Sequence, residues 1–251
     1  MKKLLIGILL IIHGSAYSQK LNPKYLPLVN SFIDCIKRQN LEKLSTKIKF
    51  PLKREYPIAP VQNKQEFIKR YKAIFDEELT KKIINSKPDA DWDDVGWRGI
   101  MLFNGDLWLD YGGSLIAVNH QSKQESDEKI RLIAAEKVKL HPLIKSFQSP
   151  VLIFETAKYR IRIDDLGNFN YRYTSWPIKS TMHDQPALIL KNGKYTPDGS
   201  GGNHNYQFKS GDYTYTCYIT VMGETGTAPA SLVITKNGKE ILSQDAKRMT
   251  P

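Results

Sequence analysis

Apolar residues recur at helical spacing over the first third of the chain. Between residues 23 and 40 they fall on one face, which predicts an amphipathic helix. A second amphipathic helix is predicted after Asn63, because its side chain can cap the first turn. Further helical turns follow Asp76, and apolar alternation around Pro51 predicts a short, interrupted strand between the helices.

The pattern changes to strand-like alternation over residues 97–120. Asn104-Gly105 and Gly112-Gly113 tolerate the positive φ of two-residue hairpin turns, so we expect a three-stranded meander. Turns at these points place one apolar set on the core face: Ile100, Leu102, Leu107, Leu109, Ile116 and Val118. The opposite face, around Asp110, is apolar enough to need cover: Trp97, Met101, Phe103, Trp108, Leu115 and Ala117.

The predicted order of elements, which is helices, a strand, more helix and then a meander, also occurs in a known family of domains. Together with the segment GIMLFNGDLWLDYGG (99–113), this order resembles the NTF2-like, cone-shaped α+β domains found in exported bacterial proteins. The resemblance covers about residues 24 to 120 and implies a curved sheet wrapped around helices. It implies a shape and no reaction, because this fold carries many functions.

The second half of the chain has a different character. Residues 125–140 predict a charged connecting helix with Ile130, Ile133, Ala134 and Val138 turned inward. From residue 149 onward, short alternating segments separated by Gly-containing turns predict an antiparallel β sandwich or barrel. We therefore expect an α+β protein in four parts: 1–18, 19–122, 123–148 and 149–251.

The first of these parts has the features of a secretory signal peptide. Two lysines precede a nine-residue apolar run, and Ala16 and Ser18 suit cleavage before Gln19. The run is too short to span about 30 Å of hydrocarbon as a helix. No Cys follows it to carry a lipid, so we expect a periplasmic or secreted protein without a stable membrane anchor.

Charge and cysteines narrow the expected partners. The chain carries a net charge of +11, which becomes +9 over the 233 residues after the signal segment. The excess is spread out, so together with export it argues against nucleic acid and leaves anionic envelope components or acidic proteins. Cys35 and Cys217 lie in different predicted domains; two buried thiols are favoured over a disulfide between them.

A glycine-rich loop is the first candidate binding element. Its backbone amides can face an anion beside a titratable imidazole, although it lacks the Lys and helix of a P-loop. A flexible connection between strands is the alternative. The candidate residues are Asp198, Gly199, Gly201, Gly202, Asn203 and His204.

Three arginines form a second candidate. A hairpin around residues 165–167 places Arg160, Arg162 and Arg172 on one face, where they can bind acidic groups. The alternative is an ordinary solvent-facing surface. The same hairpin places the aromatic and aliphatic residues of both strands, Phe169 included, on the other face.

A carboxylate beside an aromatic ring is the third candidate. Trp108 next to Asp110 can raise the pKa of that carboxyl and make it a general acid or base. The alternative is that Trp108 and Asp110 belong to a surface that another domain covers. The run Asp89, Asp91, Asp93, Asp94 begins like an EF-hand but lacks its Gly and closing Glu, so we expect no metal and no cofactor.

These features favour a noncatalytic binding protein of the cell envelope. Its partner is expected to be another protein or an anionic envelope component, for example as an immunity or inhibitor protein. The alternative is an envelope hydrolase or small-ligand enzyme that uses Asp110 or His204. Neither a nucleophile elbow nor an HExxH motif is present in the sequence to support that alternative.

Overall fold

A computed structural model describes residues 19–199 and 201–250 of the chain. The expected signal peptide lies outside the described residues. The described chain divides into two compact units. The first contains residues up to 53 and 60–122, and the second contains 54–59 and 123 onward. The short segment 54–59 thus belongs to the second unit although both its neighbours in sequence belong to the first.

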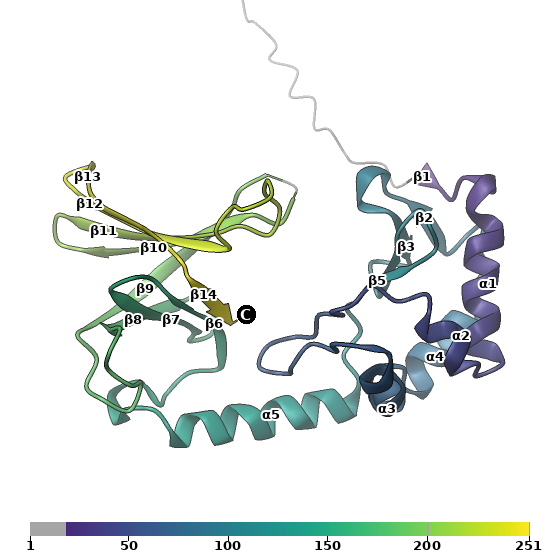
Figure 1. Cartoon of the computed structure of the whole chain (residues 1–251), viewed down its shortest axis with the longest axis horizontal. Coiled ribbons are helices and arrows are strands. Elements are labelled where there is room, and N and C mark those ends of the chain that lie inside the picture. Colours follow the sequence, from purple (N-terminus) through teal and green to yellow (C-terminus); the bar gives the residue numbers. More distant parts are fainter. Residues whose placement is uncertain (1–18, 200, 251) are drawn as a thin grey trace, which may run out of the picture. The chain divides into compact units, whose positions relative to one another are not determined.

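The first unit begins with helices (Figure 1), namely α1 (Leu26–Lys37), α2 (Leu41–Ser45), α3 (Lys64–Ile74) and α4 (Glu77–Asn85), with a 3₁₀ turn at Pro23–Tyr25 before α1. Asn40, Asn63 and Asp76 each accept a backbone hydrogen bond in the first turn of the following helix, at 2.9–3.0 Å. The helix starts predicted after Asn63 and Asp76 are therefore confirmed. The predicted strand around Pro51 is wrong, because only isolated bridges at Ile48 and Leu52 form there.

A small antiparallel sheet completes the first unit. Its strands are β1 (Gln19–Lys20), β2 (Trp92–Asp94), β3 (Ile100–Leu102), β4 (Leu107–Leu109) and β5 (Leu115–Val118), in that order, with a 3₁₀ turn at Gly96–Arg98. The predicted meander is confirmed as β3–β5. The NTF2-like assignment is not confirmed; the order of helices and strands is what the described residues establish.

One half of the predicted meander register is wrong. A β-bulge between Trp108 and Leu109 shifts the pairing, so that Leu109 lies opposite Leu115. Leu115 is therefore fully buried with the core, and Ile116, expected there, is only partly buried. The bulge adds a residue to one strand, and every side chain beyond it changes face. Trp97, expected under cover, is exposed.

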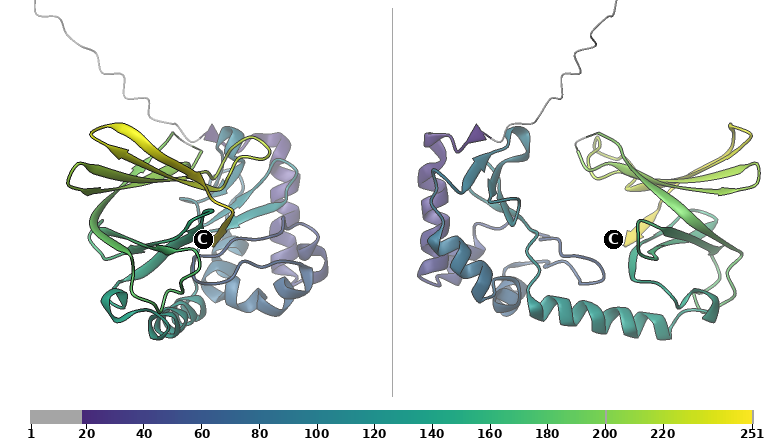
Figure 2. Two further views of the ribbon diagram at one scale, coloured as in Figure 1. Left: turned by 60° about the vertical axis from the view of Figure 1, so that its left-hand side comes forward. Right: turned by 180° about the vertical axis from the view of Figure 1, so that it is seen from behind.

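The second unit is dominated by a large antiparallel sheet. Its order is β13-β12-β11-β10-β9-β8-β7-β6-β14, and it curls into a half-barrel rather than a two-sheet sandwich or a closed barrel (Figure 2). The strands are β6 (Ser149–Glu155), β7 (Tyr159–Asp165), β8 (Tyr171–Pro177), β9 (Leu188–Pro197), β10 (His204–Ser210), β11 (Tyr213–Ile219), β12 (Ala230–Lys236), β13 (Lys239–Asp245) and β14 (Arg248–Thr250).

Each face of the large sheet has its own core. The inner face buries aliphatic and aromatic side chains such as Phe154, Ile163 and Phe208. The outer face of β7–β9 is covered by the end of α5 (Lys123–Val138), a 3₁₀ turn at Pro142–Ile144 and Phe147, which pack on Trp176. Strands buried on both faces lose the simple in–out alternation that a one-sided sheet shows.

The inward face predicted for α5 is only partly correct. Ile133 packs against the Trp176 cluster, but Ile130 is 67% exposed and Val138 is 72% exposed. The helix has no continuous apolar stripe, so a short stretch of it contributes to the core. None of the helices in the described part of the chain is long and apolar enough to cross a membrane.

Candidate functional site

The glycine-rich loop joins β9 to β10 and is fixed to the chain that follows β11. The Asn203 Oδ1 atom accepts hydrogen bonds from the amides of Val221 and Met222, each at 2.8 Å. The Asn203 Nδ2 group donates to the Met222 carbonyl at 2.9 Å. A Cβ placed on Gly201 or Gly202 would lie 3.3–3.4 Å from these two side chains. The glycines therefore allow two loops to pack closely at one end of the sheet.

Beside this loop, aromatic rings from three neighbouring strands come together on the inner face. The centroid of Tyr206 lies 4.9 Å from Tyr171, 5.5 Å from Tyr195 and 5.4 Å from His204. The Tyr195 and His204 centroids are 5.1 Å apart. We call these four residues the Tyr–His cluster. Tyr206 is buried, Tyr171 and His204 are half-buried, and Tyr195 is 45% exposed, so the cluster runs from core to surface.

The tautomer of His204 follows from its neighbour. Its Nδ1 atom lies 2.8 Å from the Gly202 carbonyl oxygen, which only accepts hydrogen bonds. Nδ1 therefore carries a proton, and in the neutral ring Nε2 is left as an acceptor. A carbonyl partner does not provide the carboxylate that orients a catalytic histidine in a triad.

The electrostatics of the cluster are set by burial and by one nearby carboxylate. Burial raises the pKa of Tyr206, and Tyr171, Tyr195 and Asp165 add to the effect. Burial also raises the pKa of Tyr171, with Asp165 again contributing. The hydroxyls therefore stay protonated at neutral pH and can both donate and accept hydrogen bonds.

The arginine face predicted from the sequence exists, but two of its three arginines are closed to solvent and the third, Arg160, is half-buried. Arg162 and Arg172 are 0% and 2% exposed, beneath Phe147 on the outer face of the sheet. Asp164 lies between them, 2.7 Å from Arg162 Nε and 2.5 Å from Arg172 Nη2. Arg160 pairs with Glu155 at 2.8 Å. These guanidinium groups are thus paired internally.

Two further groups complete the charge network around Arg162. Glu136 from α5 accepts a hydrogen bond from Arg162 Nη1. Burial opposes the charge of Arg162, but Asp164 and Glu136 outweigh it and raise its pKa. Burial and the Glu136 carboxylate also raise the pKa of Tyr56, from segment 54–59, to about 12. This network holds the covering segments on the sheet. It is stabilising only while every buried charge has its partner, because removal of one partner leaves an uncompensated buried charge.

Asp110 does not have the environment of a general acid. Burial alone would raise its pKa, but Lys49, at 2.7 Å, and the amides of Ser114 and Gly112 hold the pKa below its ordinary value. The expectation of a raised pKa is therefore wrong. Trp108 is half-buried and lies beneath the guanidinium of Arg98, 6.0 Å from its ring centroid.

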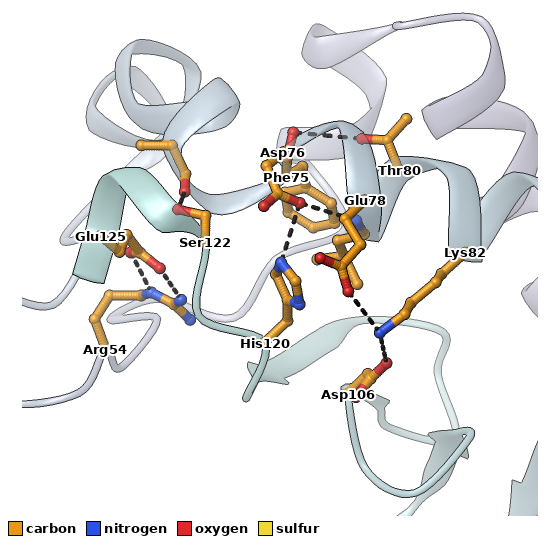
Figure 3. A network of polar contacts seen from close by, with 12 residues as sticks. Arg54, Phe75, Asp76, Glu78, Thr80, Lys82, Asp106, His120, Ser122 and Glu125 are labelled. Atoms are coloured by element: carbon orange, nitrogen blue, oxygen red, sulfur yellow. Dashed lines mark hydrogen bonds and ion pairs between the residues drawn. The ribbon is translucent and has the colours of Figure 1, made fainter. Parts of the chain in front are cut away.

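A second polar network in the first unit fixes α4 to the strand connections (Figure 3). The His120 Nε2 atom lies 3.0 Å from Asp76 Oδ1, which also caps α4. Lys82 contacts Glu78 at 3.1 Å and Asp106 at 3.3 Å. These contacts join α4 to the β3–β4 connection and to the segment that follows β5. Their role is therefore structural.

Two carboxylates of the acidic run at residues 89–94 accept local hydrogen bonds. Asp91 accepts a hydrogen bond from the Lys87 amide at 2.6 Å, and Asp94 accepts one from the Tyr111 hydroxyl. In the described ranges, no group of three or more His, Cys, Asp or Glu side chains can hold a metal ion. Cys35 and Cys217 are buried free thiols, as the sequence analysis favoured.

Three of the four residues of the Tyr–His cluster were not predicted from the sequence as a site. Tyr171, Tyr195 and Tyr206 come from three strands, and only strand register brings them together. The available signal was the high number of tyrosines at alternate positions in the second half.

Comparison with protein-family models, with curated proteins and with solved structures finds no match for this chain.

Proposed function

We propose that this chain is an exported, noncatalytic binding protein of the cell envelope. Its ligand contacts the end of the large sheet formed by the glycine-rich loop, residues 221–222 and the Tyr–His cluster. The observation that carries the proposal is an exposed apolar and aromatic surface that includes Tyr195 on β9, together with Val221 and Met222 on a hydrogen-bonded loop. Exposed apolar residues gathered at one place commonly mark binding surfaces.

Rigidity supports this choice of surface. Tyr195 projects from β9 within a regular ladder, and Asn203 fixes the two adjoining loops with three hydrogen bonds. A surface that is ordered before binding loses less conformational entropy when a ligand arrives. Export rests on the N-terminal segment described above, and a periplasmic or secreted location is part of the same proposal.

The electrostatic arrangement favours binding over catalysis. Asp110 is an ion-paired carboxylate with a lowered pKa, and His204 pairs with a carbonyl oxygen. The arginines expected to hold an anion are neutralised by Asp164, Glu136 and Glu155. We therefore keep another protein or an envelope polymer as the partner and assign no reaction.

We also propose an NTF2-like arrangement for the first unit. Its support is the sequence of α1–α4 followed by the β2–β5 meander, with one face of that meander buried in the core. An experimentally determined structure of the unit would test this: a cone-shaped sheet wrapped around α1 supports it, and a flat sheet contradicts it.

The proposed function is tested by affinity capture from envelope extracts with matched variants. Tyr195→Ala removes the exposed ring of the cluster. Tyr218→Ala is the control, because Tyr218 is 43% exposed on β11 but points to the opposite face. We expect a component retained by the wild type and by Tyr218→Ala to be lost with Tyr195→Ala. Equal retention by all three proteins would refute this binding surface.

A further inference from the structure

The Tyr–His cluster has features that define the chemistry of its ligand, and this inference rests on the proposed function. We propose that the cluster binds a neutral sugar residue of an envelope glycan. The Tyr195 ring supplies the stacking surface, and His204 with the tyrosine hydroxyls supplies hydrogen bonds.

Strand register places the cluster on one continuous surface. Tyr195 pairs with Tyr206, and Tyr171 pairs with Gly193 of the same strand β9. A Cβ on Gly193 would lie 2.1 Å from the Phe208 ring, so Phe208 occupies the space above this glycine. The buried rings of Phe208 and Tyr206 thus form a solid base, from which Tyr195 extends into solvent.

The mixture of polar and apolar surface suits a sugar. A pyranose ring presents C–H groups on its faces and hydroxyls around its edge. Tyrosine combines an apolar ring with a hydroxyl that donates and accepts, so it can match both parts. In its neutral tautomer, the His204 ring has an acceptor at Nε2, because its Nδ1 proton is directed to the Gly202 carbonyl.

The charge near the cluster argues for a neutral ligand over an anionic one. Asp165 lies opposite Tyr171 in the pairing of β7 with β8, on the same face of the sheet. Burial is the main cause of the raised pKa of Tyr171 and Tyr206, and Asp165 adds to it. A carboxylate repels phosphate or uronate groups but accepts hydrogen bonds from sugar hydroxyls. Arg162 and Arg172 are buried on the opposite face of the sheet and are paired with Asp164, so they offer no compensating charge.

The test measures binding of the full mature chain to defined glycans. The probes are N-acetylglucosamine oligomers, β-linked glucose oligomers and mannose oligomers, with oligogalacturonate as the anionic contrast. We expect at least one neutral probe to bind, with affinity that changes little with added salt. Tyr195→Ala is expected to weaken it by about tenfold or more, and Tyr218→Ala by less than about twofold.

Two further variants separate ring stacking from loss of fold. Tyr195→Phe keeps the ring and should retain most of the affinity, whereas Tyr195→Trp should show a shift of its fluorescence when the sugar binds. Unchanged thermal unfolding of each variant shows that the sheet is intact. Equal weakening by Tyr195→Phe and Tyr195→Ala would contradict the stacking role.

The outcomes distinguish this inference from the function on which it rests. Salt-sensitive preference for oligogalacturonate would overturn the neutral-sugar assignment. If no glycan binds but envelope capture still depends on Tyr195, the sugar assignment is wrong and the binding surface stands. If neither glycan binding nor capture depends on Tyr195, both proposals fail.

Discussion

At the scale of single residues, Asp164 compensates the charge of the two arginines buried beneath Phe147. Its carboxylate is fully buried and bonds two guanidinium groups that are themselves buried, those of Arg162 and Arg172. Arg172 also donates to the Ser146 and Ile144 carbonyls, at 3.0 and 2.7 Å, so it holds the covering turn as well.

Asp164→Ala is therefore expected to destabilise the second unit by about 3–5 kcal/mol, because it leaves two buried cations with too few acceptors. Glu155→Ala is the control: its pair with Arg160 is about one-fifth exposed on each side, and we expect about 1 kcal/mol or less. Urea unfolding followed by hydrogen exchange of peptides from β7 and β8 measures both. Similar effects of the two substitutions would contradict the central role of Asp164.

Asp76 makes a pH-dependent contribution to the first unit. Burial raises its pKa, but the Leu79 amide and His120 outweigh this, so the pKa is below its ordinary value. A carboxylate with a depressed folded-state pKa stabilises the fold above its unfolded pKa. That contribution is lost as pH falls through the folded pKa.

Asp76→Asn keeps a good helix cap and removes the charge, so it isolates this effect. At neutral pH we expect the variant to be less stable by about 0.5–1 kcal/mol. The difference from the wild type should shrink as pH falls through the folded-state pKa of Asp76, which lies below its ordinary value. Urea unfolding at neutral pH and over a series of descending acidic pH values measures it; a constant difference would show that charge is not the cause.

At the scale of elements, the Asn203 side chain joins the loop before β10 to the loop after β11. Its side chain satisfies the amides of Val221 and Met222 and the Met222 carbonyl. We expect Asn203→Ala to accelerate hydrogen exchange at both amides by about tenfold, because each loses its acceptor. Asn205→Ala, one position inside β10, is the control and should leave those amides unchanged. Equal exchange in both variants would show that other contacts hold the loops.

Several elements could be predicted from sequence because their signals are local. Side-chain caps at Asn63 and Asp76 mark helix starts, and the paired turn glycines mark the meander. The bulge that turns Leu115 inward could not be predicted, because it depends on pairing between β4 and β5. The extra residue reverses the pattern without leaving a sequence signal of its own.

The candidate sites were harder to predict than the elements, because their chemistry depends on which segments pack over the sheet and on how its strands pair. The sequence predicted one solvent-accessible face for Arg160, Arg162 and Arg172, because alternation along a strand does not show what covers that strand. Phe147 and α5 bury that face and convert a candidate anion site into a structural network. His204 was found from its loop, but its aromatic neighbours depend on register across three strands.

At the scale of the whole molecule, the path of the chain is the main feature that sequence patterns did not indicate. Segment 54–59 interrupts the first unit in sequence and belongs to the second. Its Arg54 donates to Glu125 at the start of α5 through two hydrogen bonds, one of 2.7 Å. Both side chains are only 4% exposed, so this ion pair lies inside the second unit.

Arg54→Ala and Glu125→Ala are each expected to destabilise the second unit by about 3–5 kcal/mol, since each removes one partner of a buried ion pair. The double variant should lose less than the sum, with a coupling of about 1 kcal/mol or more. Lys123→Ala is the control: its pair with Asp127 is largely exposed, and we expect about 0.5 kcal/mol or less. Hydrogen exchange of α5 peptides in urea measures the series.

A fragment that starts at residue 123 lacks Arg54, so we expect its stability to be no higher than that of Arg54→Ala. Wild-type stability in that fragment would show that segment 54–59 is dispensable.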